Sequence, residues 1–136
     1  MTAELSALAA ALLVQVATLT VYAVVANREL GHRVTLSPRD GGIPPLSPLL
    51  GRLQRATTNG FEGLALFAPA VLIVAVGGSS DGFTAFAAWA YVALRILYIP
   101  AYAFGWVPWR SLIWGLGLLA TLTLIGAALA RAYILA

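Results

Sequence analysis

Four long apolar stretches follow one another along the chain, separated by segments rich in polar residues, Gly and Pro. The first, residues 5–27, carries no formal charge, and a helix of this length, rising about 1.5 Å per residue, crosses a hydrocarbon core of ~30 Å. The third is interrupted only by Arg95. The pattern predicts an all-α fold of four transmembrane helices in one membrane domain over residues 1–136, with spans at about 5–27, 52–76, 83–104 and 110–133.

The segments between these stretches have the composition of turns and loops. "GGSSDG" (77–82) and "GWVP" (105–108) are short and made of residues that interrupt helices, so each predicts a tight turn. The first connection, residues 28–51, is the only long one, and its "SPRDGGIPPLSP" is too rich in Pro and Gly for a helix.

The composition agrees with a membrane protein and excludes several other classes. Hydrophobic residues make up 61% of the chain and charged residues only 10%, with a mean hydropathy of +0.91, whereas a soluble domain has about 25% charged residues. The net charge of +3 comes from arginines spread over loops and helix ends, which argues against a nucleic-acid surface. The chain has no Cys and only one His, His32, so we expect no metal site.

The distribution of arginines predicts how the chain is oriented in the membrane. Most arginines outside the apolar stretches belong to the first and third connections: Arg28, Arg33, Arg39, Arg52 and Arg110. The opposite side has Asp81 in its turn, with Glu4 and Arg131 near the two ends of the chain. Under the positive-inside rule, the first and third connections face the cytoplasm and both termini face outward.

Two of the predicted helices carry a stripe of polar residues. At about 100° per residue, four side chains of the second helix fall within an arc of ~80°, namely Arg52, Arg55, Asn59 and Glu62. On the third helix, four more fall within ~60°, namely Tyr91, Arg95, Tyr98 and Tyr102. A charged side chain at mid-membrane costs ~2.5–3.5 kcal/mol on insertion scales, so both stripes should face the interior of the bundle or a cavity.

Two interpretations of these stripes are open. In the first, Glu62 neutralises Arg95 or Arg55 and the polar residues only hold helices together. In the second, the stripes line a polar pocket. Arginine binds carboxylates through a planar fork, so several arginines on one wall indicate a small anionic ligand, with more than one carboxylate.

Three segments resemble the MAPEG family, the membrane-associated proteins of eicosanoid and glutathione metabolism. They are "RLQRATTNGFE" (52–62), "ALRILYIPAY" (93–102) and "WRSLIW" (109–114), and the four spans with a long first connection also match the family's layout. The resemblance implies a left-handed four-helix bundle assembled as a homotrimer, with a glutathione pocket at each subunit interface. It also suggests a bacterial-type member, in the inner (cell) membrane of a bacterium.

The resemblance assigns roles to individual residues. Those implied to bind glutathione are Arg52 at the outer edge, Arg55, Asn59, Glu62 and Arg95, with Tyr98 and Tyr102 contacting it from the neighbouring subunit. Arg110 is near the arginine that polarises the glutathione sulfur in enzymatic members, so it is the implied catalytic residue. Glutathione would be the co-substrate, and the second substrate a lipophilic electrophile from the bilayer, as in a microsomal-type glutathione transferase or peroxidase.

The chain departs from the family pattern at two positions. The family usually has a proline three residues beyond the glutamate, where this chain has Ala65, with Pro69 one turn later. An aromatic residue often follows the glutamate, where this chain has Gly63. These departures favour an alternative, a non-catalytic membrane protein that binds a small anionic ligand or lipid. A small transporter or channel is a weaker alternative, because the sequence shows neither inverted repeats nor broken helices clearly.

Overall fold

The computed structural model describes the backbone of residues 1–135 and is all-helical over that range. The helices are α1 (Ala3–Leu30), α2 (His32–Thr35), α3 (Pro48–Val76), α4 (Gly82–Ala103) and α5 (Trp109–Leu135). All except α2 are long and apolar enough to cross a membrane. Each of the four predicted spans coincides with one of these helices, although α3 begins at Pro48, one turn before the expected start, and α4 ends at Ala103.

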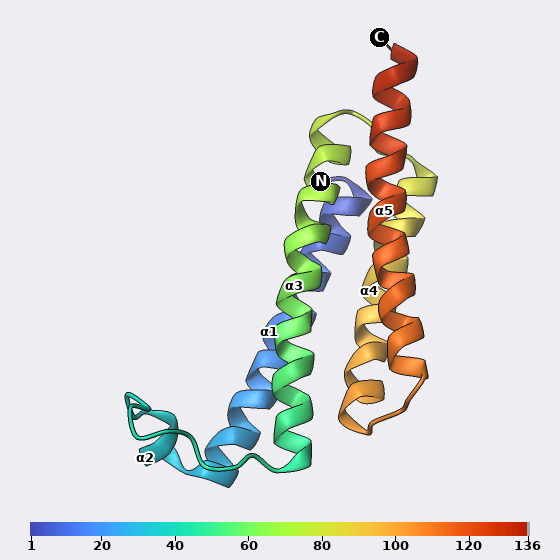
Figure 1. Cartoon of the computed structure of the whole chain (residues 1–136). Coiled ribbons are helices and arrows are strands. Elements are labelled where there is room, and N and C mark those ends of the chain that lie inside the picture. Colours follow the sequence, from blue (N-terminus) through green and yellow to red (C-terminus); the bar gives the residue numbers. More distant parts are fainter. Residues whose placement is uncertain (136) are drawn as a thin grey trace.

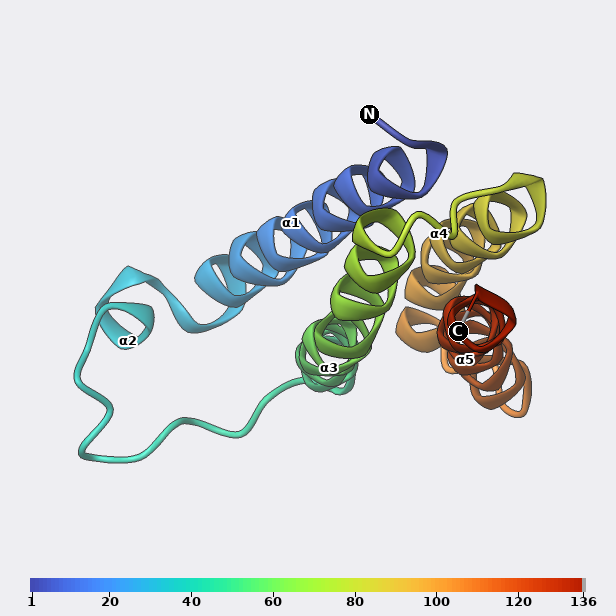
Figure 2. The same ribbon diagram turned by 90° about the horizontal axis from the view of Figure 1, so that it is seen from above.

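The four long helices run alternately up and down (Figure 1). The first connection and the turn after α4 lie at one end of the bundle, while the N-terminus, the turn after α3 and the end of α5 lie at the other. Both α1 and α5 pack against the pair formed by α3 and α4, which are themselves in contact. Figure 2, seen along the bundle, shows α1 and α5 on opposite sides of this pair. Any site between α3 and α4 is therefore central to the fold.

Polar side chains cap the helices where the sequence changes from breakers to apolar residues. The Ser47 hydroxyl accepts a hydrogen bond from the backbone N–H of Leu50 at the start of α3. At the start of α4, the Asp81 carboxylate accepts from the backbone N–H of Thr84, and the Thr84 hydroxyl accepts from the Asp81 N–H, forming a capping box. The bond from the Thr84 backbone N–H lowers the pKa of the Asp81 carboxyl.

Small residues bring the helices close together, while large apolar side chains cover the outside. The core contains many alanines. Its largest fully buried apolar side chains are Phe67 and Leu124. Leu50 is also fully buried, but it lies outside this core cluster. By contrast, Leu13 and Phe86 are 70% and 73% exposed. In lipid, helices associate by close packing rather than by burying apolar surface, so this inverted distribution is that of an integral, multi-pass membrane protein.

Two polar contacts hold α1 against its neighbours within the apolar region. Gln15 Nε2 donates a hydrogen bond to the backbone carbonyl of Thr57 on α3, at 3.0 Å. The Gln15 side chain fits there because residue 60 is Gly, whose added Cβ would lie 2.0 Å from the Gln15 Oε1. Near the other end, Thr84 Oγ1 on α4 donates to the buried Glu4 carboxylate at 2.6 Å.

The chain has Ala65 where the family usually has a proline, and its own proline, Pro69, lies one turn later inside α3. Pro69 has no N–H, so the carbonyl of Ala65 cannot receive the usual helical hydrogen bond from that position. The helix nevertheless continues to Val76. Residues 52–62, which carry the polar stripe, lie entirely before this interruption.

Candidate functional site

The two polar stripes face each other across α3 and α4. Arg95 Nη1 on α4 donates a hydrogen bond to Asn59 Oδ1 on α3, at 3.1 Å. One turn nearer the end of the bundle, Arg55 Nε on α3 donates to the Tyr102 hydroxyl on α4, at 3.2 Å. The antiparallel packing of α3 and α4 brings these four side chains into contact, although Arg55 is exposed in the single chain.

Arg52 lies where α4 ends. Its Nη1 donates to the backbone carbonyl of Ala103 at 3.4 Å, one of the carbonyls that a helix end leaves without an internal partner. An added Cβ at Gly105 would lie 3.1 Å from the Arg52 Cζ, and Gly105 has a φ of +69°. Arg52 therefore packs beneath the turn between α4 and α5, and it connects α3 to that turn.

The ring of Tyr102 lies between two guanidinium groups. The Cζ of Arg55 is 6.0 Å from the ring centroid, and the Cζ of Arg110, from α5, is 5.1 Å from it. Aromatic faces attract cations at such distances. Arg110 of α5 and Arg55 of α3 therefore share one phenol.

Arg95 is half-buried and lies beside Tyr98. Its Cζ lies 4.5 Å from the ring centroid of Tyr98, which is only 4% exposed. Its hydrogen-bond partner among the described residues is the neutral amide of Asn59. Glu62, expected to be desolvated and in one interpretation to neutralise Arg95 or Arg55, is instead exposed in the single chain. Among the described residues, the hydrogen bonds between side chains that join α3 to α4 at this cluster are Arg55–Tyr102 and Arg95–Asn59, and neither includes the Glu62 carboxylate.

A groove of about 490 Å³ opens beside this cluster. It is lined by Asn59, Tyr98, Tyr102, Arg110, Ser111, Trp114 and Gly115. The sequence analysis did not assign Ser111 or Trp114 to the site. Trp114 follows Arg110 by four residues on α5, and this spacing places both side chains on one helix face. The spacing could therefore have assigned Trp114 to the site from the sequence.

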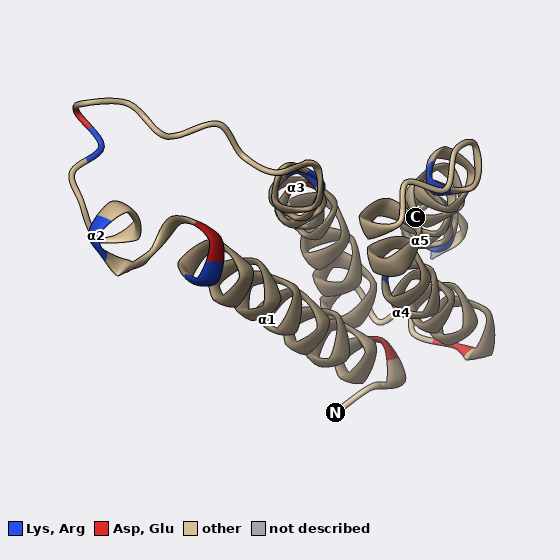
Figure 3. Cartoon of the chain, turned by 90° about the horizontal axis from the view of Figure 1, so that it is seen from below, with Lys and Arg blue, Asp and Glu red and all other residues tan. Residues whose placement is uncertain are grey.

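Four arginines and one glutamate are thus placed at or near the groove. Figure 3 shows the molecule from the end that carries the first connection, where most of the basic residues are found. Arg55, Asn59 and Tyr102 come together with Arg110, whereas Glu62 lies further along α3 and is exposed. An excess of guanidinium groups around a groove favours an anionic ligand.

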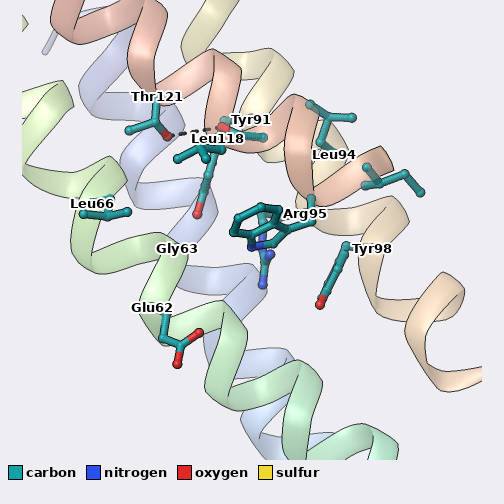
Figure 4. Close-up of a pocket in the computed structure, with 12 residues that line it drawn as sticks. Glu62, Gly63, Leu66, Tyr91, Leu94, Arg95, Tyr98, Leu118 and Thr121 are labelled. Atoms are coloured by element: carbon teal, nitrogen blue, oxygen red, sulfur yellow. Dashed lines mark hydrogen bonds between the residues drawn. The ribbon is translucent and has the colours of Figure 1, made fainter. Parts of the chain in front are cut away.

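A smaller pocket of about 70 Å³ lies further from that end, between α3, α4 and α5 (Figure 4). It is lined by Glu62, Gly63, Leu66, Tyr91, Leu94, Arg95, Tyr98, Ile113, Trp114, Gly117, Leu118 and Thr121. Tyr98 and Trp114 border both this pocket and the larger groove, so the two cavities are neighbours.

Comparison with known proteins gives one match. Residues 7–130 match the sequence profile of the MAPEG family, which is nearly the whole chain. None of the curated proteins and none of the solved structures shows significant similarity to it. The family is one of membrane proteins of eicosanoid and glutathione metabolism, and its profile spans all four long helices and both polar stripes. The chain belongs to the MAPEG family.

Proposed function

We propose that the protein binds glutathione in the groove beside Tyr102 and joins it, through its sulfur, to a lipophilic electrophile from the bilayer. The observation that carries this proposal is the convergence of Arg55, Arg95 and Arg110, from three different helices, on two tyrosines. Glutathione has two carboxylates and one amino group. An arginine-rich groove with a nearby carboxylate has the complementary charges.

The groove offers distinct groups for the two kinds of ligand charge. Arg55 is exposed and already oriented by Tyr102, so its remaining N–H groups are available to a carboxylate. Asn59 uses its oxygen to accept from Arg95, which leaves its NH₂ group to donate to a peptide carbonyl. Glu62 supplies the negative charge for an amino group. Arg52 supports the turn at the outer edge.

Arg110 is the proposed catalytic residue. A free thiol has a pKa of about 8.5, and a nearby cation lowers this value, so that thiolate is present at neutral pH. Arg110 borders the groove and packs against Tyr102, which fixes its guanidinium close to the ligand. Once the thiolate is formed, conjugation requires only that the electrophile be held next to it.

Assembly as a homotrimer is part of the proposal. In the single chain, Tyr102 contacts Arg55 on α3 of the same chain and Tyr98 packs against Arg95, while Arg55 and Glu62 remain exposed. A second copy packed against this open side would enclose the ligand and desolvate those charges. The arginines of the first and third connections lie at the same end as the groove, so we place this end in the cytoplasm of a bacterial cell, with both termini outside.

The competing proposal is a non-catalytic protein that binds a small anionic ligand or a lipid. Gly63 favours it, because the family often has an aromatic ligand contact at that position. The two proposals differ in the state of the bound thiol. We expect the detergent-purified protein to bind glutathione in calorimetry, to raise the thiolate absorbance at neutral pH, and to conjugate a generic electrophile. Binding without thiolate or turnover would favour the non-catalytic protein, and failure to bind glutathione would refute the first proposal.

A further inference from the structure

The smaller pocket of Figure 4 has a volume of about 70 Å³, which limits what can enter it. A cavity needs roughly 10–15 Å³ to hold one water molecule, and a cavity of about 150 Å³ holds benzene. The pocket therefore accommodates a group of a few heavy atoms, which is far smaller than glutathione. Its walls are mostly apolar, from residues such as Leu66, Leu94 and Leu118.

Tyr91 supplies a buried polar side chain to this pocket. The side chain is only 3% exposed. Its ring stacks on Phe67 of α3, with the centroids 3.8 Å apart and the planes 7° from parallel. On α5, the position of an added Cβ at Gly117 would be 3.8 Å from the same ring. The ring is thus held by both neighbouring helices, and its hydroxyl has a fixed position.

Gly63 makes room for that hydroxyl. An added Cβ at position 63 would lie 2.8 Å from the Tyr91 oxygen, so any larger residue would displace it. In Figure 4 the hydroxyl points from α4 toward α3 at this glycine. The departure from the family pattern at position 63 therefore has a local consequence. The missing aromatic side chain is replaced by a phenol that reaches in from another helix.

The Tyr91 hydroxyl still has a hydrogen bond to donate. Among the described residues that line this pocket, Arg95 donates a side-chain hydrogen bond to Asn59, and Thr121 donates one to the Gly117 carbonyl. Neither bond includes the Tyr91 hydroxyl. Among the described residues, Ser80 Oγ is the buried side-chain polar atom without a partner, so the Tyr91 hydroxyl is open to the pocket rather than sealed inside the fold. A phenol that borders a mostly apolar pocket can donate this bond to an acceptor atom of a ligand inside it.

We propose that this pocket binds the carbonyl group of the lipophilic substrate, with the Tyr91 hydroxyl donating to the carbonyl oxygen. The proposal rests on the function proposed above and specifies its substrate class as α,β-unsaturated aldehydes and ketones. The pocket shares Tyr98 and Trp114 with the groove, so a carbonyl inside it places the conjugated double bond toward the thiol. The aliphatic remainder of the substrate extends past Leu66, which is exposed to the bilayer.

The reaction balances without another reactant. The glutathione sulfur forms a bond to the β-carbon, and the π electrons of the C=C bond shift to give an enolate. Its oxygen carries the negative charge and receives a stronger hydrogen bond from Tyr91 than the neutral carbonyl did. The proton lost by the thiol returns, through solvent, to the α-carbon. The product is a saturated carbonyl compound with a thioether, and no group leaves.

Two acceptors separate this role from transferase activity in general. 2-Nonenal has a carbonyl, and benzyl chloride is a thiol-reactive electrophile without oxygen. We expect Tyr91→Phe to lower kcat/KM for 2-nonenal by a factor on the order of 10², as for loss of one oxyanion donor, and to leave benzyl chloride unaffected. Tyr133→Phe, at an exposed position on α5, is the matched control. Equal effects of Tyr91→Phe on both acceptors, or no effect on either, would overturn the proposal.

A spectroscopic measurement tests the contact without turnover. 2-Nonanone labelled with ¹³C at the carbonyl cannot be conjugated, and a hydrogen bond lowers its carbonyl stretching frequency. In nanodiscs, we expect the wild type to show a lowered band that is missing in Tyr91→Phe. Gly63→Ala should also remove it by displacing the hydroxyl, and it provides a second variant should Tyr91→Phe fold poorly.

The two measurements distinguish the proposals. A wild type that shows the lowered band but conjugates neither acceptor would refute the transferase function and support the carbonyl site. A wild type that conjugates benzyl chloride but shows no lowered band, or one that Tyr91→Phe retains, would refute the site and leave the transferase function standing.

Discussion

The guanidinium of Arg95 donates its hydrogen bond to the amide of Asn59, at 3.1 Å, and this pair joins α4 to α3 at the centre of the polar cluster. An amide accepts the bond without cancelling the positive charge. The half-buried guanidinium consequently keeps its attraction for an anion, which a carboxylate partner such as Glu62 would have reduced.

The Arg95–Asn59 pair should behave as one unit in ligand binding. We expect Arg95→Gln and Asn59→Ala each to weaken glutathione binding, and the double variant to be much less than additive. The coupling should be about 1–3 kcal/mol, the range for hydrogen bonds to charged groups in contact. Calorimetry on the four proteins of the cycle measures it. Strict additivity would show that the two side chains act independently.

Glu62 should contribute to binding rather than to folding, because it is exposed in the single chain. We expect Glu62→Gln to lower glutathione affinity by about tenfold, equivalent to ~1.4 kcal/mol, with little change in thermal stability of the subunit fold. Glu29→Gln is the matched control, since Glu29 is also exposed but accepts from Ser47 near the first connection. A similar loss of affinity in both variants would contradict a specific role for Glu62.

Helix positions and helix faces were predictable because both depend on local pattern. Long apolar stretches identified the four spans, and the spacing of Arg55, Asn59, Arg95 and Tyr102 identified the two polar helix faces. What could not be predicted is which side chain contacts which. One of the two open interpretations paired Glu62 with Arg95 or Arg55, but the register of α3 against α4 places Asn59 beside Arg95.

Contacts set by the depth and rotation of packed helices were also beyond the sequence. Gly63 reads in the sequence only as a lost aromatic contact, whereas in the fold it accommodates the Tyr91 hydroxyl. Similarly, Gln15 is one polar residue in an apolar run, and only the close approach of α1 at Gly60 explains it. Small residues permit such approaches but do not specify their partners.

The orientation in the membrane can be tested with two matched glycines. Gly41 in the first connection and Gly82 at the start of α4 are both exposed, and an added Cβ would have nothing within 4 Å at either. The natural chain has no Cys. In intact cells, an impermeant maleimide should label Gly82→Cys and not Gly41→Cys, whereas both should react after the membrane is permeabilised. Labelling of Gly41→Cys from outside would reverse the proposed orientation.

The contact between α1 and α3 should depend on the glycine beneath Gln15. Gly60→Ala would put a methyl group 2.0 Å from the Gln15 Oε1, which forces the side chain away and breaks its bond to Thr57. Overpacking of this kind costs about 1–3 kcal/mol. Gly126→Ala, on α5 with nothing within 4 Å, is the control and should cause no loss. Unfolding in detergent mixtures measures both, and equal stability would show that α1 adjusts freely.

Arg55 and Arg110 share Tyr102 but should affect different kinetic parameters. Arg55 is proposed to hold a ligand carboxylate in both the ground and the transition state, so Arg55→Ala should raise KM for glutathione with little change in kcat. Arg110 is proposed to stabilise the charge on sulfur, so Arg110→Ala should raise the apparent thiol pKa. Without the Arg110 cation the thiolate is less stable, so the rate at neutral pH should fall and should recover as the pH rises.

The measurement is a pH–rate profile for each variant with saturating glutathione, read beside direct binding. Arg131→Ala serves as the control, because Arg131 is exposed near the opposite end of α5. Tyr102→Phe keeps the ring that both arginines face and removes only the hydroxyl that accepts from Arg55. We therefore expect it to change both KM for glutathione and the apparent thiol pKa only slightly. If Arg110→Ala leaves both the pH profile and the maximal rate unchanged, Arg110 does not activate the thiol. An inert wild type would in addition favour the non-catalytic binding protein.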